Sequence, residues 1–432
     1  MRLTANYEGF RHFWHGLTPK PGDSTLNPIN RVKLQAMYSS KLAYFAYTMA
    51  MVGNYWLLLG PGGVTQAHKE LLLTHRVATL CLVNAELANM QGLPSEELIG
   101  AVVVMAAADP DHFLKQADSN SRHSRFQSPL AKAQVLHIIG HEPLVSAHYL
   151  ALWRLIRLKG AAWEDYHDFG LAEICELLCI IHASIAGEKP EFPAIDRSRH
   201  AFFSGHYDTG DAAKDLRLKL SMALPSEWLK SLLELSFLRS GPSMMDVIVL
   251  MKHISLALEH FHRGARDAPD FANIIQARTG IQHKLLSLPQ DPEGMSPADM
   301  YLYKLCRFCL LIYSNMVLFP LPPSSGVGTQ LAMALKALLI EESQTHVFAR
   351  DTTELKLLLW AVVLGGISDG SDVDRSWFQD QYRRVASDIG IGSWQQLETQ
   401  LTSFLWLDFV LNKEAVGFWA ESRMRSAPGV LP

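Results

Sequence analysis

A cluster of histidines and carboxylates in the middle of the chain could carry acid–base chemistry. The segment RHAFFSGHYDTGD holds His200, His206, Asp208 and Asp211. Imidazole titrates near neutral pH and a neighbouring carboxylate can fix its tautomer, so this combination suits proton transfer. The same residue types also suit a polar turn between two helices. If the protein is an enzyme, this segment is the first place to look for its active site.

A second histidine group has a spacing that a helix could bring to one face. His137 and His141 are four residues apart and His148 follows them, which could suit metal ligands. Gly140 and Pro143 interrupt the helix between them. We therefore expect capping or partly exposed histidines here rather than a metal site.

A third group, His253, His260 and His262, lies in KHISLALEHFHRG. His253 and His260 fall on one helical face, but no carboxylate pair or cysteine completes a metal-binding set. Histidines near a helix C-terminus interact favourably with the helix dipole. We predict a structural role for all three.

The cysteines are an odd number spread through apolar segments, which is typical of a reduced, intracellular protein. They are Cys81, Cys175, Cys179, Cys306 and Cys309. The last two form a lone CxxC within a helical pattern. Zinc needs four ligands and a thioredoxin-type site needs a preceding strand, so we interpret both as core residues.

Other catalytic motifs are missing from the sequence. It contains no GxSxG turn, and the glycine-rich Gly60–Gly63 lacks the Lys-Ser/Thr ending of a P-loop. No DDxxD-like carboxylate group is present. The sequence therefore assigns no catalytic residue, no cofactor and no metal.

Several tryptophans fall at helical spacing among aliphatic residues and are predicted to be core. They are Trp153, Trp360, Trp394 and Trp406. Large aromatic side chains could also line an apolar cavity between helices, where small ligands often bind.

The composition is that of a globular protein, with 48% hydrophobic and 19% charged residues. The net charge is −4 and no run of Lys and Arg occurs, which disfavours direct nucleic-acid binding. The N-terminus shows no secretory signal. The apolar stretch Leu42–Leu59 is interrupted by polar residues and is interpreted as a buried helix rather than a membrane span.

The elements that would position these residues are helices. Apolar residues recur three and four positions apart, and strand-like alternation is almost absent. Ser243, Ser296 and Ser393 have the spacing of helix caps. Leu355–Leu364 is apolar nearly all round, which requires several layers of helices around it. The segment Asp109–Ser128 is polar and is predicted to be a mobile surface loop.

We therefore predict an all-α protein, a single large multi-layer array of antiparallel helices over residues 1–432. Division into two lobes near Pro193–Leu220 is the alternative.

Five segments, in this order along the chain, resemble the regulatory (middle-homology) domain of fungal transcription factors. They are Glu70–Ala88, His141–Lys159, Phe169–Pro193, Leu321–Val327 and the tryptophan-rich Leu359–Trp419. The resemblance covers most of the chain, from about Glu70 to Trp419. The six-cysteine zinc cluster, the basic linker and the coiled coil that accompany this domain in the family have no counterpart here.

The resemblance implies a regulatory protein without its own DNA-binding module. Such a protein would act through protein partners or a bound small apolar ligand, in the nucleus or, alternatively, in the cytoplasm. A first alternative is a repurposed biosynthetic enzyme of the cyclase or isomerase type that uses an apolar pocket in the helical scaffold. A second is a fragment of a zinc-cluster transcription factor whose DNA-binding exon is missing.

Overall fold

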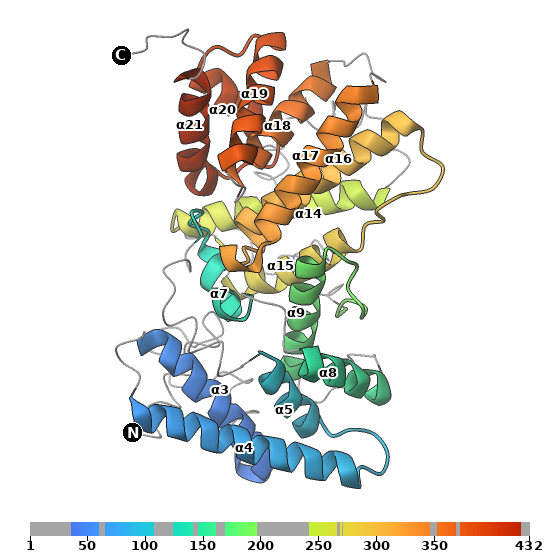
Figure 1. The fold of residues 1–432 in the computed structure, drawn as a ribbon, viewed down its shortest axis with the longest axis vertical. Coiled ribbons are helices and arrows are strands. Elements are labelled where there is room, and N and C mark those ends of the chain that lie inside the picture. The colour runs from blue at the N-terminus through green and yellow to red at the C-terminus, as the bar shows by residue number, and fades with distance from the viewer. Residues whose placement is uncertain are drawn as a thin grey trace. The chain divides into compact units, whose positions relative to one another are not determined.

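The described residues of the computed structural model form helices and connecting segments, with no strand among them (Figure 1). The all-α prediction is confirmed. The structure describes residues 36–59, 65–107, 124–140, 146–160, 169–196, 242–265, 268–269, 271–345, 352–368 and 372–424. The chain divides into two compact units, and the long boundary between them falls between Ile195 and Asp196.

Unit 1 comprises residues up to His123 together with Lys132–Ile195. Its helices are α3 (Lys41–Leu59), α4 (Gln66–Asn89), α5 (Glu96–Ala107), α7 (Leu136–Ile139), α8 (Ser146–Lys159) and α9 (Phe169–Ala186). Helix α5 is buried from Leu98 to Ala106 and contacts α3, α4, α8 and α9, so it forms the centre of this unit. The predicted buried helix at Leu42–Leu59 corresponds to α3, and Leu42, Ala46 and Met49 are indeed buried.

Unit 2 comprises Ser124–Ala131 and the chain from Asp196 onward. Its helices are α14 (Pro242–His262), α15 (Phe271–Leu286), α16 (Pro297–Tyr313), α17 (Val327–Thr345), α18 (Thr352–Ile367), α19 (Asp372–Asp388), α20 (Trp394–Thr402) and α21 (Asp408–Met424). Helix α18 is buried from Leu357 to Ile367 and contacts α16, α17, α19, α20 and α21. The prediction that Leu355–Leu364 lies under several layers of helices is therefore confirmed from Leu357 onward, while Leu355 is partly exposed.

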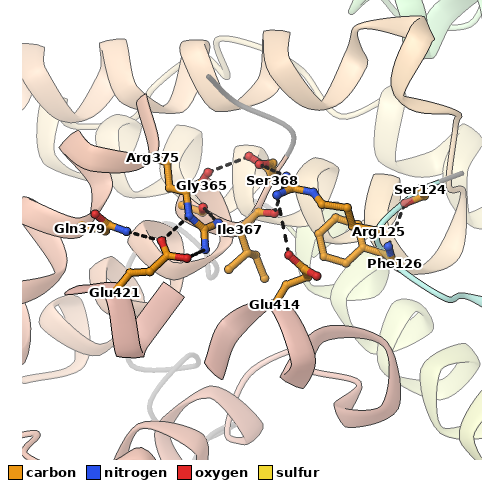
Figure 2. A network of polar contacts seen from close by, with 11 residues as sticks. Ser124, Arg125, Phe126, Gly365, Ile367, Ser368, Arg375, Gln379, Glu414 and Glu421 are labelled. Atoms are coloured by element: carbon orange, nitrogen blue, oxygen red, sulfur yellow. Dashed lines mark hydrogen bonds and ion pairs between the residues drawn. The ribbon is translucent and has the colours of Figure 1, made fainter. Parts of the chain in front are cut away.

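The C-terminus of α18 is held by two arginines from other parts of the chain (Figure 2). Arg375 donates from Nη1 to the carbonyl of Gly366 at 3.0 Å, and Arg125 donates from Nη2 to the carbonyl of Ser368 at 2.9 Å. Glu421 accepts from Arg375 at 2.9 Å and from Gln379 at 2.8 Å. The last carbonyls of a helix have no partner within the helix, so the guanidinium groups satisfy them and also oppose the negative end of the helix dipole.

The predicted surface loop Asp109–Ser128 needs correction at its end, while residues 109–123 lie outside the described part of the chain. Phe126 is buried, and Ser128 donates from Oγ to the carbonyl of Val317 at 2.6 Å. Two residues on, the carbonyl of Leu130 accepts from Nη1 of the buried Arg278 at 3.1 Å. Ser128 and Leu130 thus make hydrogen bonds with residues that are far away in the sequence. The polar composition of a segment does not show whether its groups make such bonds or are hydrated.

The predicted helix starts are partly confirmed. Ser296 caps α16 by accepting from the backbone N–H of Asp299 at 3.1 Å, and Ser393 forms a capping box with Gln396. Helix α14 begins at Pro242, one residue before the predicted cap Ser243.

The contact between α18 and its neighbours predicts a specific packing defect. A Cβ atom at Gly366 would collide with the Phe418 ring. We expect Gly366→Ala to lower the free energy of unfolding by about 1–3 kcal/mol, because overpacking forces a buried ring to move. Urea denaturation measures this change.

Gly417 provides the matched control, because it also lies in a helix and a Cβ there meets no atom within 4 Å. Gly417→Ala should stabilise the protein by about 0.5–1 kcal/mol. Equal effects of the two substitutions would contradict this account of the core.

Candidate functional site

Four chemically capable side chains share one face of α14. Lys252, Ser255, Glu259 and His262 follow the spacing i, i+3, i+7 and i+10, which keeps residues on the same side of a helix. The residues between them, such as Ile254 and Leu258, are buried apolar side chains that fix the helix against its neighbours. We call these four residues, with Tyr313 and Asp408, the α14 seam.

Tyr313 joins the seam from the end of α16. Its hydroxyl lies 2.7 Å from Ser255 Oγ, and both residues are buried. Ser255 donates its only hydroxyl proton to the carbonyl of Met251 at 2.7 Å, so Tyr313 is the donor in the bond between the two hydroxyls. A π-helical turn, Ser314–Leu318, follows Tyr313 directly. Such turns are frequent at functional sites.

The first turn of α21 completes the seam. The rings of His262 and Phe409 are stacked, with centroids 3.8 Å apart and an interplanar angle of 6°. This contact holds the end of α14 against the start of α21, where Asp408 is the first residue. The charges of Glu259 and Lys252 act on the Asp408 carboxyl, although no hydrogen bond or ion pair between Asp408 and either residue occurs in the described part of the chain.

The surroundings of the Lys252 amine disfavour its charged form. Burial lowers its pKa below the ordinary value of 10.5, and the nearby carboxylates of Glu259 and Asp408 oppose this shift only in part. Within the described part of the chain, the amine makes no hydrogen bond or ion pair. Lys252 is thus a partly buried amine near, but not bonded to, two carboxylates.

The pKa of Asp408 is shifted in the opposite direction, upward. Its residue is exposed at the edge of the seam, yet partial burial of the carboxyl, followed by the charges of Glu398 and Glu259, raises its pKa. Glu398 is itself held by Asn412, which donates to it at 2.8 Å. Burial likewise raises the pKa of the Tyr313 hydroxyl.

The α14 seam therefore combines an amine whose pKa is lowered with a carboxyl whose pKa is raised. Titratable groups whose environments shift their pKa values in this way are typical of acid–base sites. Among the described residues, no group of three or more His, Cys, Asp and Glu side chains could hold a metal ion.

The structure describes only part of the first two histidine groups that the sequence singled out. His200, His206, Asp208, Asp211 and His141 lie outside the described residues, as does the side chain of His137. His148 is partly exposed on α8. The structure therefore does not describe either of the first two histidine groups as a set.

The third histidine group lies on α14, with His260 and His262 in its last turn. His262 belongs to the α14 seam through its stack on Phe409, whereas the pair that the sequence placed on one face was His253 and His260. The predicted association with a helix C-terminus agrees with the positions of His260 and His262.

The CxxC cysteines are buried in α16, as predicted. Burial raises the pKa of the Cys306 thiol to about 12 and also raises that of Cys309. A protonated, buried thiol is a poor nucleophile and a poor metal ligand. Cys81, in contrast, is exposed on α4.

Three of the four tryptophans predicted to be core are buried, namely Trp153, Trp360 and Trp406. Trp360 stacks on Phe404 with ring centroids 5.2 Å apart. Trp394 is instead partly exposed and meets Trp419 at 6.2 Å. Trp153, Trp360 and Trp406 are therefore core residues, as the sequence predicted.

Sequence reasoning did not find Lys252, Tyr313 or Asp408. They are separated by up to about 150 residues and belong to no motif, so only the packing of α14, α16 and α21 brings them together. The one available signal was the spacing of Lys252, Ser255 and Glu259 along a single helical face.

No protein-family model, curated protein or solved structure matches the chain. The assignment of the α14 seam therefore depends on the contacts and electrostatics of its residues alone.

Burial predicts how the five cysteines react. In dilute, reduced, folded protein, Cys81 should react rapidly with N-ethylmaleimide, while the four buried cysteines should react only after unfolding. Mass spectrometry of digested protein measures each rate. Cys81→Ser should remove the fast reaction, and labelling of Cys306 or Cys309 at the rate of Cys81 would show that the core description is wrong.

The raised pKa of Asp408 predicts a pH-dependent effect of its removal. Because the fold favours the protonated carboxyl, ionised Asp408 reduces stability as the pH rises above the ordinary value of 3.8. Asp408→Asn should therefore be more stable than the wild type at neutral pH, and the difference should shrink toward about pH 4.

Urea denaturation at the two pH values measures the effect of Asp408→Asn. Glu293→Gln, in the exposed loop between α15 and α16, is the control and should show little change. An Asp408→Asn variant less stable than the wild type at neutral pH would contradict the assigned electrostatics.

Proposed function

We propose that the chain is a transcription-factor-like regulatory protein that acts through protein association rather than by binding DNA itself. The ordered resemblance to fungal regulatory domains, the all-α fold and the net charge of −4 support this function. The observation that carries it is the outer face of α4, and the resemblance suggests action in the nucleus.

Helix α4 has its polarity reversed relative to an ordinary surface helix. Its buried positions are Leu72, His75, Thr79 and Val83, so half of the inward face is polar. His75 and Thr79 are accommodated there by hydrogen bonds to backbone carbonyls one turn earlier, each 2.8 Å long. The inward face alone therefore does not account for the apolar character of the helix.

The outward face of α4 is apolar at its centre. Leu73 is 51% exposed and Val77 is 59% exposed, and Cys81 continues the line one turn later. Helix α4 is also long and apolar enough to cross a membrane by length and composition, the one described helix that passes this test. An exposed apolar line of this kind marks an interaction surface.

A second copy of the chain, packed antiparallel along α4, fits this face. The large residues Leu73 and Val77 lie in the N-terminal half of the exposed face, and the small residues Ala85 and Ala88 lie in the C-terminal half. Antiparallel pairing places the large half of each copy against the small half of the other, as an isologous interface requires. It also brings the two Cys81 residues together near the centre and aligns the helix dipoles favourably.

This surface predicts concentration-dependent dimerisation. Val77→Glu should weaken the dimer at least about tenfold, because it places a charge in the apolar contact. Sedimentation equilibrium measures the dissociation constant. Two independent readouts follow from Cys81: a mild oxidant should join two wild-type copies through it, and its reaction with maleimide should slow as protein concentration rises.

Leu158→Glu is the matched control, because Leu158 is 55% exposed on α8 of the same unit and lies outside the α4 face. It should leave dimerisation unchanged. A wild-type chain that remains monomeric, that binds neutral lipid vesicles through α4 instead, or that binds DNA selectively at high salt would contradict the proposed function.

A specific observation favours a second candidate, the repurposed enzyme. The α14 seam contains an amine whose pKa is lowered, a carboxyl whose pKa is raised and a hydrogen-bonded pair of hydroxyls, a combination of groups that is found at acid–base sites.

A further inference from the structure

We propose that Ser387 is a phosphorylation site for an arginine-directed serine/threonine kinase, and that Arg383 and Arg384 bind the phosphate once it is attached. Ser387 lies in the last turn of α19, in the sequence Arg-Arg-Val-Ala-Ser. The inference goes beyond the proposed function. It concerns unit 2 and needs neither the α4 surface of unit 1 nor the α14 seam.

Several hydroxyl side chains in the sequence have an arginine three residues before them, and the structure distinguishes among them. Thr79 and Ser128 are buried, and their hydroxyls donate to backbone carbonyls at 2.8 Å and 2.6 Å. Thr353 is half-buried, and Ser426 lies outside the described residues. Among the described residues with this spacing, Ser387 is the one whose side chain is exposed.

Two arginines lie on the same face of α19 as Ser387. Arg384 and Arg383 precede it by three and four residues, which is the spacing that makes side chains neighbours on a helix surface. Arg384 is exposed, and Arg383 forms an ion pair with Asp380 on the same helix. A phosphate carries about two negative charges at pH 7 and three acceptor oxygens, so it is a stronger partner for a guanidinium than one carboxylate.

The end of α19 makes Ser387 accessible to an enzyme. The backbone N–H of Ile391 donates to the carbonyl of Ala386 at 2.8 Å, and that of Gly390 donates to the carbonyl of Ser387 at 3.2 Å. Gly390 has a φ of 73°, so these bonds form a Schellman cap. Asp388, Gly390 and Gly392 are exposed. Helix ends open locally at a low cost in free energy, which lets a kinase bind this turn in an extended form.

The modification changes the charge of this end of α19. The phosphate faces the negative end of the helix dipole and follows directly before Asp388, so both disfavour it. The guanidinium groups of Arg383 and Arg384 oppose that effect. A third one lies beside the following loop, where Arg423 donates to the carbonyl of Gly392 at 3.1 Å. Phosphorylation therefore replaces an excess of positive charge here with paired charges.

The reaction is a phosphoryl transfer from ATP. The Ser387 Oγ attacks the γ-phosphorus, and a base of the kinase takes the hydroxyl proton. A P–O bond to Ser387 forms, the bond from the γ-phosphorus to the bridging oxygen breaks, and ADP leaves.

Phosphorylation of the full chain tests the site. The folded protein is incubated with magnesium ATP and the catalytic subunit of cAMP-dependent protein kinase, and peptide mass mapping follows each site with time. Ser387 should be modified faster than any other described hydroxyl. Arg384→Gln should slow this reaction about tenfold or more, because the kinase loses a charged hydrogen bond. Thr399→Ala is the control, since Thr399 is an exposed hydroxyl on α20 with no arginine before it, and the rate at Ser387 should stay unchanged.

Phosphorus NMR of the modified protein tests the partners of the phosphate. The second pKa of phosphoserine is about 6, and pairing with two guanidinium groups should lower it, because they favour the dianion. Substitution of both arginines, Arg383→Gln with Arg384→Gln, followed by prolonged phosphorylation, should raise this pKa again. A folded chain in which Ser387 stays unmodified, an unchanged rate in Arg384→Gln, or an equal phosphate pKa in the double variant would overturn the inference.

Discussion

Unit 2 depends on satisfying polar groups inside a core built only from helices. Helix α18 is buried over its last eleven residues, Leu357 to Ile367, so its final carbonyls cannot rely on water. Arg375 and Arg125 supply the missing donors, and each comes from a different part of the chain. A buried polar group without a partner costs about 1–3 kcal/mol, comparable to a large fraction of total stability. The same constraint explains Arg278, whose wholly buried guanidinium donates to Leu130 and whose pKa burial lowers to about 9.

Two places differ from this hydrogen-bonded core: helix α4 and the α14 seam. The proposed functions concern these two places. On α4 the inward face carries His75 and Thr79, while Leu73 and Val77 face outward. On the α14 seam, Lys252 lies partly buried near carboxylates without bonding to them. In both cases the local arrangement lowers the stability of the isolated chain relative to an ordinary alternative, such as a polar outer face or an ion-paired lysine. A second copy, as proposed, would offset this at α4 by covering the exposed apolar side chains.

Local features of the sequence were sufficient to predict much of the fold. The all-α class, the buried apolar helix α18, the caps at Ser296 and Ser393 and the buried CxxC all follow from spacing within about a dozen residues. The cap of α4 was missed because His68, rather than Glu or Gln, closes the capping box with Thr65. Long-range pairs could not be predicted: Arg125 reaches Ser368 across 243 residues, and Lys252 and Asp408 are joined only by the packing of α14 on α21. Their residue types are common, and no local pattern specifies their partners.

The central physical claim is that helix packing desolvates Lys252 more than the neighbouring carboxylates compensate. Direct NMR titration of the Lys252 side chain in the folded protein, with the signal assigned by Lys252→Arg, tests it. The account predicts a pKa below the ordinary lysine value of 10.5. A value at or above 10.5 would show that Glu259 and Asp408 fully stabilise the ammonium, and would contradict the account.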